Sequence, residues 1–360
     1  MTEKDYLIAL STFVAFGPQR LKLLISYFKK PSKIWNASKS DLLETGMSAK
    51  TVENFISHRD NFELDDYFKK LENLNIKTFT LFEDNYPTNL KEITDAPFVL
   101  YVRGKLEKSD SRSVAIVGTR MMTSYGKEVT NKFATQLANF GITVVSGLAL
   151  GVDAEAQRSA LAAGGRTISM LASGLDIISP YTNKALALEF IKKNGAVISE
   201  YPLGYPPHPY DFPVRDRLIS GMAKAVVVIE GRMKSGTFYT VKAAADQGRP
   251  VFAVPGPITS PVSEGPNYLI QNGAKLVTKV SEVLEELNMQ TMVNPQLVEK
   301  VMPDTKEQAK ILAILDREPL HLDELVRISG LQTNEISATL TIMEMKGMVK
   351  NLGQGMYKKI

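Results

Sequence analysis

The sequence predicts an α/β protein with a doubly wound parallel sheet, preceded by a helical domain and followed by a winged helix. Six short apolar runs, rich in valine and isoleucine, lie at residues 114–117, 142–146, 167–173, 196–200, 225–230 and 251–255. Such runs are typical of strands buried on both faces, as in a parallel sheet with helices on either side. A glycine follows each run within four residues. Because ligands bind beyond the carboxyl ends of parallel strands, these glycines mark the candidate site.

Composition narrows the class of protein. The chain has 360 residues, enough for two or three domains, and its 44% hydrophobic and 23% charged content is typical of a globular protein. The absence of cysteine excludes disulfides and thiolate metal sites and indicates a reducing compartment. The three histidines lie far apart, so a histidine metal site is not expected. With no signal-peptide pattern and no 18-residue apolar run, we expect a cytoplasmic protein that does not span a membrane.

Residues 1–65 predict a helical domain that resembles a helix-hairpin-helix arrangement. Gly17 and Pro18 are expected to begin one helix, and Ser38 or Ser40 to cap another. The overall net charge is only +4, but residues 15–50 hold seven lysines and arginines against two acidic residues. A basic face of this kind favours phosphate backbones, while a solvated helical surface explains it equally well.

Residues 66–288 predict the sheet domain. Thr78–Phe82 and Phe98–Val102 are expected to extend or flank the main sheet. Ser124 is expected to cap the helix that follows the first apolar run, and Asp153 to cap the helix after the second. Further helices are predicted over 184–193, 237–247 and 281–287.

The C-terminal part predicts a linker over 289–304 and a winged helix over 305–360. Three helical segments precede a hairpin formed by Met348–Leu352 and Met356–Lys359. The exposed face of the third helix has no arginine, which makes it poorly suited to reading duplex DNA in the major groove. Weak duplex binding and a protein contact both remain open for this domain.

The first strand-to-helix loop contains Gly118, Thr119 and Arg120. It lacks the glycine pattern of dinucleotide-binding folds, and the chain has no phosphate loop of the nucleotide-hydrolysing type. Arginine offers a planar fork that grips phosphate, so Arg120 is predicted to bind phosphate rather than form a salt bridge at the sheet edge. Gly147, after the second strand, is expected to let the backbone approach the same ligand.

Two further segments end at the same edge of the predicted sheet. Residues 201–213 hold five prolines, and then Phe212 is followed by Arg215 and Arg217. A ring beside arginines suits single-stranded nucleic acid, although a rigid lid explains the segment equally well. Residues 235–237, Ser-Gly-Thr at a helix start, predict an anion-binding nest beside Lys234. No nucleophile–base pair is apparent, so the sequence favours binding over bond cleavage.

Together these motifs resemble the DNA-processing protein A (DprA, also called Smf) family. The matching stretches are residues 115–120, 124–126, 146–153, 174–176, 199–200, 212–221, 235–237, 247–249, 254–256 and 267–274. The resemblance implies an extended Rossmann-like fold that binds single-stranded DNA without a nucleotide cofactor, forms homodimers and loads the RecA recombinase. It also implies a non-enzymatic role in natural transformation.

Carried over residue by residue, the resemblance places the DNA site on the loop around Arg120, the segment around Phe212 and the start of the helix at residues 235–237, with Gly147 and Gly174 beside them. The expected DNA-binding residues are Gly118, Thr119, Arg120, Gly147, Gly174, Phe212, Arg215, Arg217, Lys184, Lys234, Ser235, Gly236 and Thr237. The expected dimer contacts are Asn267, Tyr268, Leu269 and Gln271.

The chain departs from the family pattern at three positions. Asp216 stands where the family usually has asparagine, Gln157 where it has histidine, and Pro209 where a lysine is frequent. The missing lysine removes one expected phosphate contact, and Asp216 adds a repulsive charge unless Arg215 or Arg217 neutralises it. Lys184 or Lys234 is expected to compensate.

Two alternatives were weighed against DNA binding. A nucleotide-processing enzyme of the lysine-decarboxylase-like type is disfavoured because Thr240 replaces its catalytic glutamate. A winged-helix transcription regulator is disfavoured by the arginine-free third helix.

Overall fold

The computed structural model describes residues 1–193, 195–289, 305–316, 318–345 and 348–359. These residues form two compact units, one within Met1–Met292 and the other within Val293–Ile360. Among the described residues, no helix has both the length and the apolar character needed to cross a bilayer.

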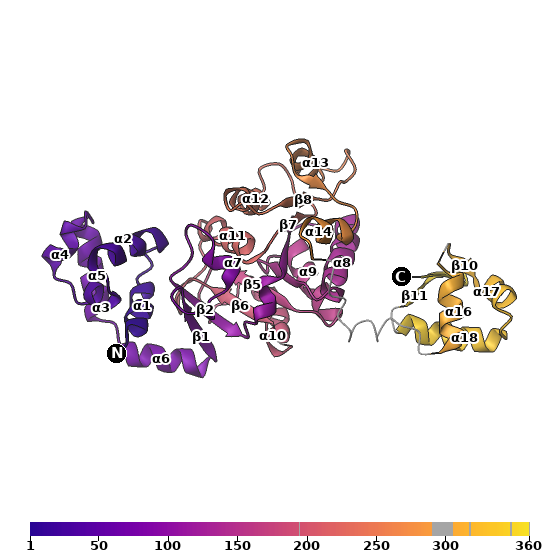
Figure 1. The fold of residues 1–360 in the computed structure, drawn as a ribbon, viewed down its shortest axis with the longest axis horizontal. Helices are drawn as coiled ribbons and strands as arrows, with labels where there is room; N and C mark the ends of the chain where they lie inside the picture. The colour runs from indigo at the N-terminus through magenta and orange to yellow at the C-terminus, as the bar shows by residue number, and fades with distance from the viewer. Residues whose placement is uncertain (194, 290–304, 317, 346–347, 360) are drawn as a thin grey trace. The chain divides into compact units, whose positions relative to one another are not determined.

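The larger unit is built on one nine-stranded sheet in the order β1-β2-β6-β5-β4-β3-β7-β8-β9 (Figure 1). Its strands are β1 (Ile76–Thr80), β2 (Val99–Gly104), β3 (Ser113–Val117), β4 (Thr143–Ser146), β5 (Thr167–Leu171), β6 (Ala196–Ser199), β7 (Val226–Val228), β8 (Val251–Ala253) and β9 (Lys275–Leu276). The six predicted runs become β3 to β8 and pair in parallel, which confirms the predicted sheet. The two expected flanking strands extend it antiparallel, β1 on β2 and β2 on β6.

Helices cover both faces of this sheet. They are α7 (Thr88–Lys91), α8 (Ser124–Asn139), α9 (Val152–Ala162), α10 (Lys184–Lys192), α11 (Asp211–Met222), α12 (Thr237–Asp246), α13 (Glu264–Gln271) and α14 (Val280–Glu286). Successive residues of a strand face opposite sides, so Val114 and Ile116 of β3 pack with α8, α9 and α14. Ala115 and Val117 pack with α7, α11, α12 and α13 on the other side. This double cover explains why the strands are apolar throughout.

Two predicted helix caps are wrong by one or two residues. Thr123, not Ser124, is the N-cap of α8, because its side-chain oxygen accepts the Gly126 N–H. The N-cap of α9 is Gly151, which has a positive φ of 77°. Asp153 lies inside the helix and its carboxylate accepts the Gly147 N–H at 3.0 Å instead. Neighbouring hydroxyl and carboxylate residues compete for a cap, so sequence alone does not separate them.

The N-terminal helices belong to the same compact unit as the sheet (indigo in Figure 1). They are α1 (Glu3–Thr12), α2 (Pro18–Phe28), α3 (Pro31–Trp35), α4 (Lys39–Glu44), α5 (Ala49–Asp60) and α6 (Leu64–Asn73). Gly17 and Pro18 begin α2 as predicted, and of the two candidate caps Ser38 caps α4. Their apolar residues join one core cluster with Phe98, Val99 and Tyr101 of the sheet domain.

The smaller unit has the predicted winged-helix order. Its elements are α16 (Lys306–Ile314), β10 (Leu320–His321), α17 (Leu322–Ser329), α18 (Thr333–Met345), β11 (Val349–Gly353) and β12 (Met356–Lys359). The three strands pair in the order β10-β12-β11, and Gly330 ends α17 with a φ of 67°. Residues 290–304 of the predicted linker lie outside the described residues. The predicted domain boundaries stay predictions.

Candidate functional site

A cleft of about 660 Å³ opens at the carboxyl edge of the sheet, where the glycine loops were predicted to meet. Three segments far apart in sequence form its walls: the loop after β3, the first two turns of α11, and the start of α12. The lining residues are Val117, Gly118, Thr119, Arg120, Ala149, Asp153, Pro209, Phe212, Pro213, Arg215, Asp216, Ile219, Ser235, Gly236, Thr237, Tyr239 and Thr240. The structure thus brings together eight of the predicted DNA-binding residues.

The loop from Gly118 to Thr123 is braced by Glu230, a buried residue after β7. The Thr119 N–H donates to the Glu230 carbonyl at 2.7 Å. The Thr123 N–H and hydroxyl both donate to the Glu230 carboxylate, at 2.9 and 2.6 Å. A Cβ on Gly126 would lie 2.1 Å from that carboxylate, so only glycine fits there. These hydrogen bonds to Glu230 therefore fix the conformation of the loop that presents Arg120.

Two guanidinium groups lie within 6 Å of the centre of the Phe212 ring. The Arg120 Cζ atom is 5.5 Å from the ring centroid, and the Arg215 Cζ atom is 5.8 Å from it. Both distances are within the range of cation–π attraction. The three side chains also line a smaller hollow of about 100 Å³ with Gly147 and Leu150. A half-buried ring with an exposed arginine beside it offers a base-stacking surface next to a phosphate-binding charge.

Arg215 differs from Arg120 because it is buried. Its Nη1 atom donates to the carbonyls of Gly147 and Met170, and its Nε atom donates to Asp216 at 3.1 Å. A Cβ on Gly147 would lie 2.6 Å from that guanidinium. Arg215 was predicted as a direct DNA contact. The structure instead assigns most of its donors to the protein, so its main effect on the cleft is the charge and shape it provides.

Two carboxylates share the cleft with these arginines. Burial raises the pKa of Asp153 to about 6, against the opposing effect of the Arg215 charge. Burial also raises the pKa of Asp216, again opposed by Arg215. Asp216, a departure from the family pattern, forms an ion pair with Arg215, one of the two arginines expected to neutralise it.

The start of α12 supplies the predicted nest. The Ser235 hydroxyl oxygen is buried in the described structure and has no hydrogen-bond partner there. Thr237 is buried at the first position of the helix, and Gly236 is exposed. Lys234 is exposed in a left-handed conformation with φ 59°. An unpartnered hydroxyl beside a helix N-terminus is suited to an anionic group.

Three predicted DNA-binding residues lie outside the lining of the cleft, and their DNA contacts stay predictions. Arg217 pairs with Asp95 and Glu200, leaving its side chain 12% exposed. The Gly174 N–H donates to the Tyr205 carbonyl, and a Cβ there would meet the Pro202 carbonyl at 2.3 Å. Lys184 lies over the Tyr181 ring at the start of α10. None of the three lines the cleft.

The predicted dimer residues divide into two pairs. Tyr268 and Gln271 are exposed on α13 and are available to a second copy. Leu269 is buried in the core, and the Asn267 side chain is engaged with both backbone polar groups of Gly256. The latter two make contacts within this chain, and a dimer through α13 stays a prediction.

Sequence reasoning did not place Asp153, Tyr239 or Thr240 in the site. Tyr239 and Thr240 follow the predicted nest on the first turn of α12, so their helical position was a usable signal. For Asp153, the sequence offered only its position after a glycine-rich loop, and that position did not predict a place in the cleft. In the part of the chain that the structure describes, no group of three or more acidic or histidine side chains is placed to hold a metal ion.

Two protein-family models match this chain. Residues 77–288 match the family model of DNA recombination-mediator protein A, and residues 298–355 match that of the DprA winged helix domain. Protein Smf of Synechocystis is 32% identical over 97% of this chain and 96% of its own length.

Two solved structures have similar folds. The X-ray structure of DNA processing protein A from Streptococcus pneumoniae is 34% identical, with a TM-score of 0.68 over 79% of this chain and 98% of that one. DNA processing protein A from Helicobacter pylori, studied for its unique single-stranded DNA binding mode, is 31% identical, with a TM-score of 0.53 over 60% of this chain and 96% of that one. The chain described here therefore belongs to the DNA recombination-mediator protein A (DprA/Smf) family.

Proposed function

We propose that this chain binds single-stranded DNA in the cleft formed by Arg120, Phe212 and the Ser235–Thr237 nest. The observation that carries the proposal is the half-buried Phe212 ring held within 6 Å of two guanidinium groups at the cleft wall. A ring stacks on any base, and an exposed arginine neutralises the backbone beside it, so the arrangement binds an unpaired strand with little sequence preference. The single-stranded DNA binding of the Helicobacter pylori relative supports the same assignment.

Replacing Arg120 by alanine tests the electrostatic part of the proposal. Arg120 is exposed at the cleft, and losing one phosphate contact is expected to reduce the slope of log affinity against log salt by about 1. The measurement is fluorescence anisotropy with a labelled oligothymidine over a salt series. Lys132→Ala, which removes an exposed positive charge on α8, is the matched control. An unchanged slope in Arg120→Ala would remove this residue from the site.

Asp153 gives the binding a pH dependence. Its pKa in the free protein is about 6, and a bound phosphate nearby raises it further because the protonated form is less repulsive. DNA binding then takes up a proton, so affinity is expected to rise as pH falls from about 8 to about 6, by less than about tenfold per pH unit. Thymine bases do not titrate in this range. Asp153→Asn isolates the aspartate: if it leaves the pH profile intact, the assignment to Asp153 is wrong.

We further propose that the bound strand is protected and handed to the RecA recombinase during natural transformation. Membership of the recombination-mediator family supports this role, and the protein is proposed to act in the cytoplasm as a homodimer through Tyr268 and Gln271. A competition assay between single- and double-stranded DNA, with and without RecA, tests it. Preferential capture of the single strand and faster RecA assembly on it are expected. RecA assembly that is unaffected by the protein would contradict the loading step.

A further inference from the structure

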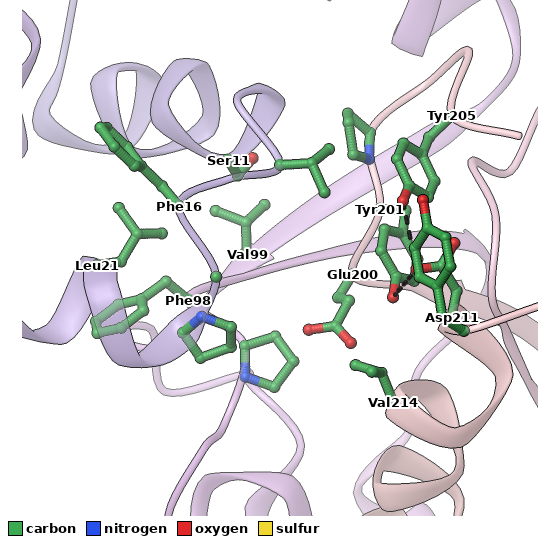
Figure 2. Close-up of a pocket in the computed structure, with 16 residues that line it drawn as sticks. Ser11, Phe16, Leu21, Phe98, Val99, Glu200, Tyr201, Tyr205, Asp211 and Val214 are labelled. Carbon is green, nitrogen blue, oxygen red and sulfur yellow. Dashed lines mark hydrogen bonds between the residues drawn. The ribbon is translucent and has the colours of Figure 1, made fainter. Parts of the chain in front are cut away.

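A second hollow, of about 260 Å³, lies on the opposite side of the first turn of α11 (Figure 2). Its walls come from the connection between α1 and α2 (Phe16), from α2 (Leu21), from the residue before β2 (Phe98), and from residues 200–214. Val214 of α11 lines this hollow, whereas Phe212 and Arg215 of the same turn line the DNA cleft. One helical turn therefore separates the two spaces, and we call the second one the α11 pocket.

Glu200 places an unsatisfied acceptor in the α11 pocket. Its side chain is 9% exposed, and its Oε2 atom is held by Arg217. Its Oε1 atom is buried and has no hydrogen-bond partner in the described structure. Figure 2 shows the carboxylate extending into the space between Phe98 and Val214. An unpaired buried acceptor is unfavourable, so a ligand that carries an N–H donor gains by supplying the missing bond.

Aromatic rings form one wall of the pocket. Tyr201 and Tyr205 are stacked at 4.6 Å with 4° between their planes, and both hydroxyls bond to the Asp211 carboxylate. His208 and Tyr210 form a second stack at 5.2 Å and 6°. Tyr210 lines the pocket and is 66% exposed, so one of its faces is covered by His208 and the other is open. A flat ligand can extend this second stack.

We propose that the α11 pocket is a second subsite for the DNA strand and binds one nucleobase that carries an exocyclic amine. The inference rests on the proposed single-stranded DNA binding and adds a base preference to it. The amine N–H donates to Glu200 Oε1 while the base stacks against the tyrosine wall. Cytosine provides such an amine where thymine has a carbonyl oxygen, and a carboxylate accepts from that amine.

The charges at the pocket favour a base over a phosphate. Glu200 and Asp211 are both carboxylates, so a phosphate is repelled from the interior, whereas a neutral base is not. The strand backbone would pass outside, where the exposed Arg20 is anchored by a bond from its Nη1 atom to the Ala15 carbonyl. Arg20 is near Phe16 and Gly17 in sequence, both of which line the pocket. This gives the basic N-terminal helices a contact with the same strand.

The test compares fluorescein-labelled oligodeoxycytidine and oligothymidine of equal length, bound to the full chain in one mildly alkaline buffer. The wild type is expected to bind oligodeoxycytidine about fivefold or more tightly. Glu200→Gln exchanges the free acceptor for an amide donor, which suits thymine O4, so the preference is expected to be lost or reversed.

Glu200→Gln weakens the ion pair with Arg217, so misfolding is a second explanation for a loss of preference in this variant. A second variant therefore tests the pocket in another way. Val214→Gln narrows the mouth of the pocket from an exposed position and leaves that ion pair intact. It is expected to abolish the preference while oligothymidine affinity stays within about twofold. Ile328→Gln, an exposed aliphatic residue of the other unit, is the matched control and should keep the preference.

Equal wild-type affinity for the two oligonucleotides overturns the inference while leaving the proposed function in place. A preference that persists in both pocket variants also overturns it, and leaves the pocket to a protein partner. Failure of the wild type to bind either oligonucleotide is a failure of the proposed function itself.

Discussion

Replacing Arg215 by alanine is expected to lower the free energy of unfolding by about 3–5 kcal/mol. The guanidinium is buried and pairs with Asp216 while donating to the Gly147 and Met170 carbonyls. Its removal takes away the buried positive charge that offsets the Asp153 and Asp216 carboxylates, and leaves two carbonyl oxygens without their donor. The loss of stability therefore comes from unpaired buried groups, and it is well above the loss expected when a surface contact is removed. Urea denaturation followed by circular dichroism measures it.

Acid should reduce this loss. Without Arg215 the pKa values of both aspartates rise further, so protonation removes their repulsion as pH falls toward 6. Arg120→Ala is the matched control, since Arg120 is exposed and its removal is expected to change stability by less than about 0.5 kcal/mol. Equal unfolding curves for the two variants would show that Arg215 does not hold the cleft together.

Replacing Phe212 by alanine is expected to weaken single-stranded DNA binding by about 1–3 kcal/mol, or five- to 150-fold. The ring lines the cleft between Arg120 and Arg215, so its loss removes the stacking surface and leaves both charges in place. The salt dependence should therefore stay unchanged while the affinity falls at every salt concentration. Anisotropy titration with oligothymidine over a salt series separates the two effects.

A half-buried phenylalanine at the other edge of the sheet controls for loss of ring packing. Phe140 follows the carboxyl end of α8 and packs against the core. Phe140→Ala is expected to lower stability but to leave DNA affinity unchanged. If Phe212→Ala binds as tightly as Phe140→Ala, the base-stacking role of Phe212 is wrong.

Much of the fold could be predicted from the sequence because its strands are buried on both faces. Six continuous apolar runs predicted the strands and their parallel pairing. The glycine after each run predicted the edge of the sheet at which the ligand binds. The direction of β1 and β2 could not be predicted in the same way. β1 pairs with β2, and β2 pairs with β6. Both pairings depend on how residues 81–98 return the chain, and no local pattern encodes that path.

The site was harder to predict because an arginine in a sequence does not reveal its surroundings. Arg215 and Arg217 are two residues apart, yet one lines the cleft and the other pairs with Asp95 and Glu200. The helical spacing held a usable signal. Arg215 shares one face of α11 with Leu218, Ile219 and Met222, and all four are buried. Residues 201–213 obscured that spacing, because their prolines suggested a loop up to Phe212.

The contacts of Glu230 have a consequence for the thermodynamics of binding. In the loop that carries Arg120, the Thr119 and Thr123 amides and the Thr123 hydroxyl already donate to Glu230, so the loop need not be ordered when a strand arrives. Little conformational freedom is then lost by the protein, and the entropic cost falls mainly on the oligonucleotide. Calorimetry should accordingly find a small heat-capacity change on DNA binding, because a loop that is already ordered buries little additional apolar area when the strand binds.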